Sequence, residues 1–159
     1  MERRVDDGVA AVVRRLVAAC GGLAVVSTIR ASGVPHSTVV NAGPTVHPVT
    51  GEPAIGLVAV GGAVKVRHLR RDPRAVVVFR DGPRWLSVEG DASLVGPDDP
   101  HPGVPAEDVP GLLREIYRAA GGGEHPDWDE FDAVMATERR TAVYIGIGRT
   151  YGVYPRAGA

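Results

Sequence analysis

The first part of the chain carries apolar residues at helical spacing. Between residues 5 and 17 the apolar positions recur every three or four residues, and charged residues occupy the opposite face. This stripe consists of Val5, Val9, Val12, Val13, Leu16 and Val17. The pair Gly21-Gly22 follows and is typical of a helix end. The pattern predicts an amphipathic helix that buries one face against the rest of the protein.

Six short apolar stretches follow, and each predicts a β-strand because turn residues bound it. They span residues 23–29, 35–40, 54–60, 74–80, 85–95 and 141–154. The first two form a hairpin, and the apolar run of the fourth predicts a strand that is buried on both faces. Residues 41–52 contain two prolines and two glycines, which predict a loop or an irregular strand. Gly146 and Gly148 indicate a bulge or a close approach of two backbones in the last strand.

Three further stretches predict short helices, at residues 65–72, 112–120 and 128–136. Strands and helices do not alternate as they do in a parallel βαβ sheet, and tight turns join the strands. We therefore expect a mainly β protein of the α+β class, an antiparallel sheet of six strands closed into a barrel with peripheral helices. In a barrel of this length, outward apolar helices favour a homodimer that hides the remaining apolar surface.

Length and composition limit the class of protein further. The chain has 159 residues, so we expect one domain over residues 1–159. A net charge of −1 excludes a chain-wide polycation, and a single cysteine excludes an internal disulfide framework. Cys20 follows a segment that resembles a lipoprotein signal, but charges such as Asp6 and Arg14 interrupt it. We expect Cys20 to be a buried small hydrophobe and the protein to be cytoplasmic.

The sequence contains no motif for nucleophilic catalysis or metal binding. No serine lies in a Gly-x-Ser-x-Gly setting, and Cys20 has no histidine near it in the sequence. The five histidines are dispersed, without a His-x-x-x-His pair or a cysteine cluster. We therefore assign no catalytic residue and no metal ligand.

The segment from Lys65 to Arg74 contrasts with the rest of this slightly acidic chain. It reads Lys-Val-Arg-His-Leu-Arg-Arg-Asp-Pro-Arg, so five cations, including the only lysine, occur in ten residues. A strand and a Gly-rich turn precede it. The N–H groups of such a turn, the start of a helix, and the Lys65 and Arg67 side chains all favour a bound phosphate. A solvated basic helix face and a short nucleic-acid contact are the alternatives.

The same segment resembles a signature of the pyridoxamine 5′-phosphate oxidase-like superfamily of split-barrel flavin and deazaflavin proteins. Residues 65–74 match its lysine-to-Arg-Arg-Asp-Pro-Arg pattern, and residues 23–40 match its opening hairpin. Residues 88–92 and 128–152 are similar to a later strand and to the closing helix and strand. The likeness covers most of the chain, and it is greatest to the actinobacterial members that use the deazaflavin coenzyme F420.

The resemblance implies a homodimer of split β-barrels with two cofactor sites at the subunit interface. The residues that would lie along the cofactor ring are His36, Ser37, Thr38, Val39, Val40, Ala59 and Val60. Lys65 would face the cofactor phosphate, Arg67 would assist it, and Trp85 would open the strand that passes near the phosphate. Backbone N–H groups near residues 38–40 would bond the carbonyl edge of the ring.

In such a protein the cofactor carries the hydride, and the protein supplies position and electrostatics. The resemblance thus implies an oxidoreductase that transfers a hydride between reduced F420 and a small unsaturated organic substrate. We favour F420 over FMN because its longer anionic tail suits the basic cluster Arg67, Arg70, Arg71 and Arg74. The alternatives are an FMN-dependent oxidoreductase, a split barrel that binds a cofactor or ligand without turnover, and a nucleic-acid-binding barrel.

Two departures from the family pattern fall at the phosphate site. Ala63-Val64 stands where the family usually has a polar or basic pair, and His68 replaces a more usual asparagine. The first change removes a hydroxyl and a charge, so it predicts a cofactor that is either held less tightly here than in relatives or not bound at all.

Overall fold

The computed structural model describes the backbone of residues 3–154 and the side chains of residues 8–154. The elements are α1 (Arg3–Cys20), β1 (Leu23–Ile29), β2 (Pro35–Val46), β3 (Pro53–Val60), α2 (Val64–Arg71), β4 (Arg74–Asp81), β5 (Arg84–Val95), η1 (Ala106–Asp108), α3 (Val109–Tyr117), η2 (Arg118–Gly122), α4 (Trp128–Thr137), β6 (Arg140–Gly146) and β7 (Arg149–Val153). The predicted helices correspond to α1, α2, α3 and α4. None of the described helices is both long and apolar enough to cross a membrane.

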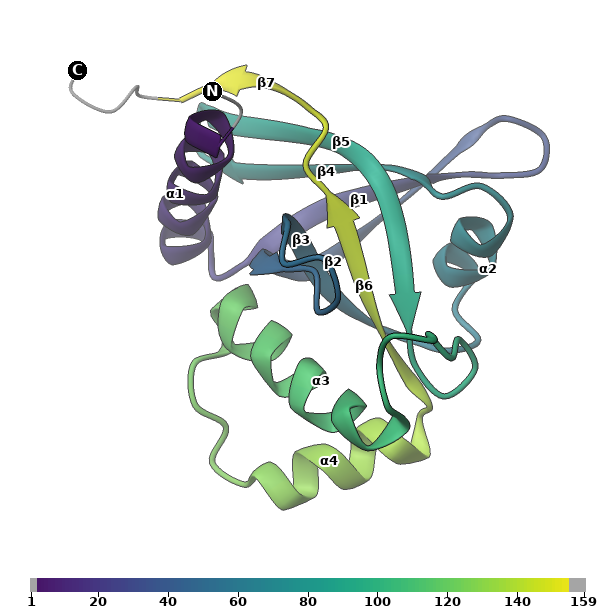
Figure 1. Ribbon diagram of the computed structural model, residues 1–159. Helices are drawn as coiled ribbons and strands as arrows, with labels where there is room; N and C mark the ends of the chain where they lie inside the picture. The colour runs from purple at the N-terminus through teal and green to yellow at the C-terminus, as the bar shows by residue number, and fades with distance from the viewer. Residues whose placement is uncertain (1–2, 155–159) are drawn as a thin grey trace.

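Six strands close an antiparallel barrel, as the sequence predicts. Neighbouring strands follow the order β4-β1-β2-β3-β6-β5, and β5 pairs with β4 to complete the circle (Figure 1). A seventh strand, β7, pairs with the first half of β5, whose second half pairs with β6. Strand β5 therefore changes partner along its length.

The change of partner occurs where two backbones touch. A Cβ atom at Gly90 would lie 1.6 Å from the carbonyl oxygen of Gly146, so only glycine fits there. Strand β6 ends at Gly146, and the chain resumes pairing with β5 at Arg149. The close approach predicted at these glycines is confirmed, but the single strand predicted over residues 141–154 is divided in two.

Alternate residues of the strands fill the barrel interior, and α1 packs against them. The apolar stripe of α1 is buried as predicted, at Val9, Val12, Val13, Leu16 and Val17, while the Val5 side chain lies outside the described residues. Each such side chain contributes roughly 1.5–3 kcal/mol when it is fully removed from water. This burial ties the N-terminal helix to the barrel.

The helices α3 and α4 cover the outer face of β3 and β6 (Figure 1). Leu113, Ile116 and Phe131 from the helices pack on Ala142 and Tyr144 of β6. Because β3 and β6 are buried on both faces, their sequences are almost continuously apolar. This helical layer forms one wall of the site described below.

Three local predictions differ from the structure. Residues 41–46 are not loop or irregular, because they continue β2 and pair with β3 through Val46. Strand β4 is not buried on both faces, since Val76 and Val78 on its outer side stay partly exposed. Cys20 is half-buried rather than buried, with its Sγ 3.5 Å from the carbonyl oxygen of Leu23.

Candidate functional site

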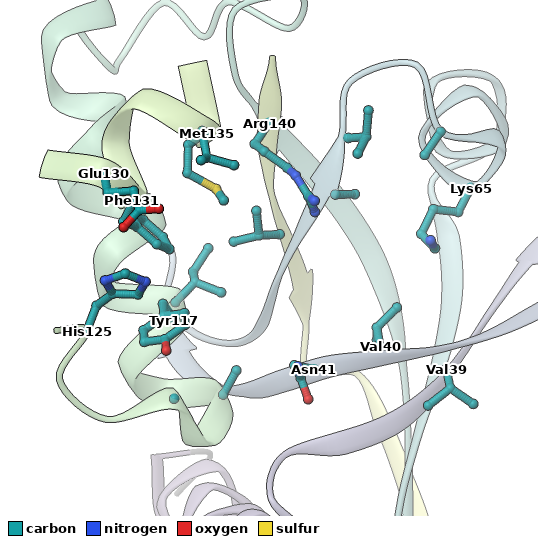
Figure 2. A pocket seen from close by; sticks show the side chains of 18 residues that line it. Val39, Val40, Asn41, Lys65, Tyr117, His125, Glu130, Phe131, Met135 and Arg140 are labelled. Carbon is teal, nitrogen blue, oxygen red and sulfur yellow. The ribbon is translucent and has the colours of Figure 1, made fainter. Parts of the chain in front are cut away.

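A cavity of about 600 Å³ lies between the barrel and its helices. Its walls come from the middle of β2, the end of β3, the start of α2, the start of β6 and the α3–η2–α4 layer (Figure 2). These segments are far apart in the sequence, so the cavity is a product of the closed fold. It is large enough for a small organic ligand.

One wall of the cavity is an open strand edge. β2 pairs with β3 from Ala42 onward, whereas the first half of β2 pairs with β1 and has no β3 partner. The N–H of Ala42 donates to the carbonyl of Gly22, so at this end of β2 the even-numbered residues turn their backbone groups toward the β1 side. The backbone groups of Val39 and Asn41 therefore face the opposite, open edge, where both residues line the cavity.

Lys65 supplies a positive charge to the cavity from the first turn of α2. Its side chain is half-buried and points into the space (Figure 2). It makes no hydrogen bond or ion pair with any described residue, and burial together with the nearby Arg140 lowers the pKa of its ammonium group. A buried cation without a counter-ion is unfavourable unless an anion binds beside it.

Arg140, at the start of β6, also lines the cavity. Gly61 lets the start of β6 lie close to the turn that precedes Lys65. A Cβ atom at Gly61 would lie 2.6 Å from the carbonyl oxygen of Arg139 and 2.7 Å from Oδ2 of Asp98. The absence of a side chain lets the turn before α2 pack directly on the first residues of β6. As a result the Lys65 and Arg140 side chains enter the same cavity (Figure 2).

Aromatic and apolar side chains form the helical wall of the cavity. Tyr117, His125 and Phe131 pack edge to face or tilted, with ring centroids 5.2–5.5 Å apart, and Met135 lies beside them. Trp128 lies directly behind this wall, 5.2 Å from the Phe131 ring. Aromatic groups packed in this way offer a rigid apolar surface.

The rest of the basic segment serves the fold. Arg70 donates two hydrogen bonds to Asp99, both 2.7 Å long, and one to the carbonyl of Gly61. Arg74 forms an ion pair with Asp72, and Arg71 donates to the carbonyl of Ile29. The hydrogen bonds that Arg70 donates to Asp99 raise the pKa of its guanidinium group, so this charge is neutralised locally. The predicted basic groove is therefore reduced mainly to Lys65 and the exposed Arg67.

The structure brings together five of the ten residues selected from the sequence. Val39, Val40, Ala59, Val60 and Lys65 line the cavity. Four others lie elsewhere: Ser37, Thr38, Arg67 and Trp85.

The reason differs for each of these four residues. Ser37 is on the outer face of the hairpin, with its Oγ 2.7 Å from that of Ser27. Thr38 points to the other face, where its Oγ1 is buried without a partner, and Arg67 is exposed on α2. Trp85 begins β5 at the end that pairs with β7, and it packs against Tyr151.

His36, also expected along the ring, instead contacts His68. Their ring centroids are 5.2 Å apart, and Oγ1 of Thr28 lies 2.9 Å from Nδ1 of His68. This polar cluster lies between β1, β2 and α2, beside the cavity rather than in it.

Sequence reasoning missed Arg140, Asn41 and the aromatic wall. A signal for Arg140 was present, since it ends the Glu138-Arg139-Arg140 run just before an apolar strand. The aromatic residues gave no such signal because helical spacing alone does not separate cavity-facing from core-facing positions. Among the described residues no group of three or more His, Cys, Asp or Glu side chains is placed to hold a metal ion.

Solved structures with the same architecture identify the fold. A pyridoxamine 5′-phosphate oxidase-related, FMN-binding protein from Nostoc punctiforme matches 92% of this chain and 81% of its own, with a TM-score of 0.64 and 12% identity. A conserved hypothetical protein from Mycobacterium tuberculosis matches over 100% and 91% of the two chains, with a TM-score of 0.63 and 22% identity. The chain has the split-barrel fold.

An F420 reductase is a further split barrel of this kind, with a TM-score of 0.54, 14% identity, and coverage of 81% of this chain and 88% of its own. No family model matches the chain. At these identities the likeness establishes the fold, and it agrees with the resemblance drawn from residues 65–74. The chemistry of this split barrel must be argued from its own cavity.

Proposed function

We propose that this split barrel binds the phosphate-bearing coenzyme F420 in the cavity and transfers its hydride to a small unsaturated organic substrate. The observation that carries the proposal is Lys65, a half-buried cation without a partner among the described residues, beside an open strand edge. Both features suit a flat ring system that ends in a phosphate. FMN is the alternative, because it shares the ring and the phosphate.

The residues present fit such a cofactor in three ways. Lys65 would hold the phosphate by a charge-assisted hydrogen bond. The N–H groups of Val39 and Asn41 would bond the carbonyl edge of the ring and stabilise negative charge there. Val40, Ala59 and Val60 would form an apolar wall along the ring. When bound, the cofactor supplies the hydride, and the chain positions the reactants.

The choice of F420 rests on fewer arginines than the sequence suggested. Arg70 and Arg74 are paired with carboxylates, so they contribute little to an anionic tail. Arg67 is exposed two residues beyond Lys65 and remains able to contact a tail that extends past the phosphate. The position of Arg67 supports F420, and a comparison of the affinities for F420 and FMN tests this choice.

We propose that the active form is a homodimer in which the outer face of β1 and β2 is covered by a second copy. Val25 and Val39 are cross-strand neighbours on this face, and they are 39% and 66% exposed. Leu23, 54% exposed, extends the patch. Val39 also borders the cavity, so the same contact would enclose the cofactor. Sedimentation of wild-type protein and of Val25→Lys tests this, because a charge at the interface should give monomers.

Cofactor titration tests the binding proposal. Trp128 lies behind the cavity wall, whereas Trp85 lies in the part of β5 that pairs with β7. A Trp85→Phe variant therefore leaves Trp128 as the source of tryptophan fluorescence. F420 and FMN should quench Trp128, whereas riboflavin, which lacks the phosphate, should bind far more weakly. Equal affinity for riboflavin and FMN would refute the phosphate assignment.

Turnover separates an enzyme from a binding module. Reduced F420 or FMN is mixed with the protein and either menadione or 2-cyclohexen-1-one, and oxidation of the cofactor is followed by absorbance. Protein-dependent oxidation supports the oxidoreductase. Tight binding without oxidation would favour a split barrel that holds its ligand without turnover. Salt-dependent oligonucleotide binding without cofactor binding would favour the nucleic-acid alternative.

A further inference from the structure

We infer that Arg140 is a specificity residue that selects a substrate carrying a carboxylate or similar anionic group on a flat apolar body. This inference rests on the proposed function and names the substrate class of the same cavity. It would assign Lys65 to the cofactor phosphate and Arg140 to a second anion. The juxtaposition of Arg140 with the Tyr117–Phe131 wall carries it (Figure 2).

Arg140 has donors to spare. Its Nε and Nη2 both contact a single oxygen, Oε2 of Glu138, each at 2.6 Å. A guanidinium group has five N–H donors in a fixed plane, so the remaining donors can bind a carboxylate without breaking this ion pair. The Arg140 side chain is 28% exposed and that of Glu138 is 40% exposed, so the ion pair lies near the surface. Figure 2 shows the Arg140 side chain pointing into the cavity.

The charges around Arg140 favour an anion. Lys65 lies close enough for Arg140 to lower the pKa of its ammonium group, and an anion bound at each of the two side chains would offset this repulsion. Glu130 is the one carboxylate among the described residues that line the cavity, and it is exposed on α4. Figure 2 shows Glu130 on the helical wall, apart from the guanidinium of Arg140, so an anionic group at Arg140 does not meet this carboxylate.

The remainder of the cavity favours a flat apolar body. Beyond Arg140 the walls are Val58, Val134, Met135, Phe131, Tyr117 and His125. Rigid aromatic edges and a flexible methionine suit an aromatic or conjugated ring system. Since Val60 pairs with Arg140 across β3 and β6, this part of the cavity lies next to the wall proposed for the cofactor ring. A substrate held there would be next to the cofactor.

A matched pair of fluorescent probes tests the anion site without any cofactor. The probe 8-anilinonaphthalene-1-sulfonate carries an anionic group, and N-phenyl-1-naphthylamine has the same rings without it. Arg140→Gln should weaken the sulfonate about tenfold or more, the size of one lost charged hydrogen bond, and leave the neutral probe within about twofold. Phe131→Leu should weaken both probes. Arg139→Gln is the control, because Arg139 pairs with Asp98 and does not line the cavity.

Competition identifies the carboxylate. Bound sulfonate probe should be displaced by 2-naphthoate and not by methyl 2-naphthoate, and Arg140→Gln should remove this difference. An equal loss of both probes in Arg140→Gln, or equal displacement by acid and ester, would overturn the inference. Normal folding of each variant is checked by its far-ultraviolet circular dichroism.

A final measurement separates this inference from the proposed function. The sulfonate probe is titrated in the presence of saturating F420 or FMN. Simultaneous binding supports two anion sites. Displacement of the probe by the cofactor would mean that Arg140 belongs to the cofactor site. This result would overturn the inference and leave the proposed function intact. If the probes respond to Arg140→Gln as expected but neither cofactor binds, the proposed function is refuted and the anion site at Arg140 is supported.

Discussion

The two ends of the basic segment 65–74 have the same charge and opposite uses. At its start, Lys65 is half-buried beside a cavity and has no partner among the described residues. At its end, Arg70 and Arg74 are held by Asp99 and Asp72. The difference is one of location. Lys65 lies at the start of α2, at the cavity, whereas Arg70 faces Asp99 in the loop after β5 and Arg74 faces Asp72 at the end of the helix. A cationic run in a sequence can therefore combine a residue that lines a cavity with residues that anchor the helix.

The largest effect is expected at Gly61, which lies in the turn before Lys65 and whose carbonyl accepts a hydrogen bond from Arg70. Gly61→Ala would place a Cβ atom 2.6 Å from the carbonyl oxygen of Arg139, which forces the turn before α2 away from β6. We expect a loss of about 2–3 kcal/mol in the free energy of unfolding, the usual cost of overpacking, together with weaker cofactor binding. Urea denaturation and cofactor titration measure the two effects.

Gly62→Ala is the matched control for this prediction. Nothing lies within 4 Å of a Cβ atom at Gly62, so its stability should stay within about 0.5 kcal/mol of wild type. If both alanine variants behave alike, the contact between the turn and β6 does not position Lys65.

Removal of the Lys65 charge should affect binding and spare the fold. Lys65→Met deletes the ammonium group and keeps the apolar stem, so we expect cofactor affinity to fall by about 1.5–3 kcal/mol, the range for a charged hydrogen bond. The free energy of unfolding should stay unchanged or rise, because a half-buried charge without a partner is removed. Arg67→Met, at an exposed position on the same helix, should lower affinity much less. A cofactor that binds Lys65→Met as tightly as wild type would contradict the assignment.

At the other end of the segment, removal of the Arg70 charge should lower the stability of the fold and leave cofactor affinity almost unchanged. Arg70→Met removes three hydrogen bonds and leaves the Asp99 carboxylate, which is 12% exposed, without its cation. We expect a loss of about 1–2 kcal/mol in the free energy of unfolding, because a partly buried acceptor becomes unsatisfied. The change in cofactor affinity should be small, and thermal and urea denaturation will report the loss.

Arg74→Met provides the surface comparison for this prediction. Its partner is Asp72, and the arginine side chain is 70% exposed, so its removal should cost less than about 1 kcal/mol. Equal losses in the two variants would show that Arg70 is an ordinary surface charge and not an anchor of α2.

The sequence predicted those parts of the fold that depend on local signals. Alternating apolar residues and turn residues identified six strands, and the glycines at 146 and 148 indicated the backbone contact with β5. The strand predicted for β2 is too short because Gly43 and Pro44 are turn residues in most contexts. Here, pairing with β3 overrides that preference. Local signals fail where a partner strand decides the outcome.

The site was predicted in part for the same reason. Lys65 and the residues of β2 and β3 near it belong to short continuous motifs, and they do meet at the cavity. Arg140, Tyr117 and Phe131 come from segments that only the closed barrel and its helical layer bring to that place. No spacing rule connects them to Lys65.

The smallest predicted effect concerns His68, which lies on α2 between its two ends. Burial lowers the pKa of its imidazole, and so do the nearby His36 and the cations Arg71, Arg30 and Arg67. Because the folded protein holds this pKa below the ordinary value of about 6.5, the unfolded chain takes up the proton first as the pH falls. The resulting stability is present above pH 6.5 and is lost as the pH falls through the lower, folded pKa.

His68→Asn should remove this pH dependence while an amide can still hydrogen-bond to Thr28. The variant should match wild type at pH 8 and lose less stability than wild type on acidification. His47, whose pKa is also lowered mainly by burial, contributes to the slope that remains. Urea denaturation at several pH values between 5 and 8 measures both curves. Parallel curves would mean that His68 takes up its proton at the same pH in the folded and the unfolded protein, so that its protonation does not affect the stability.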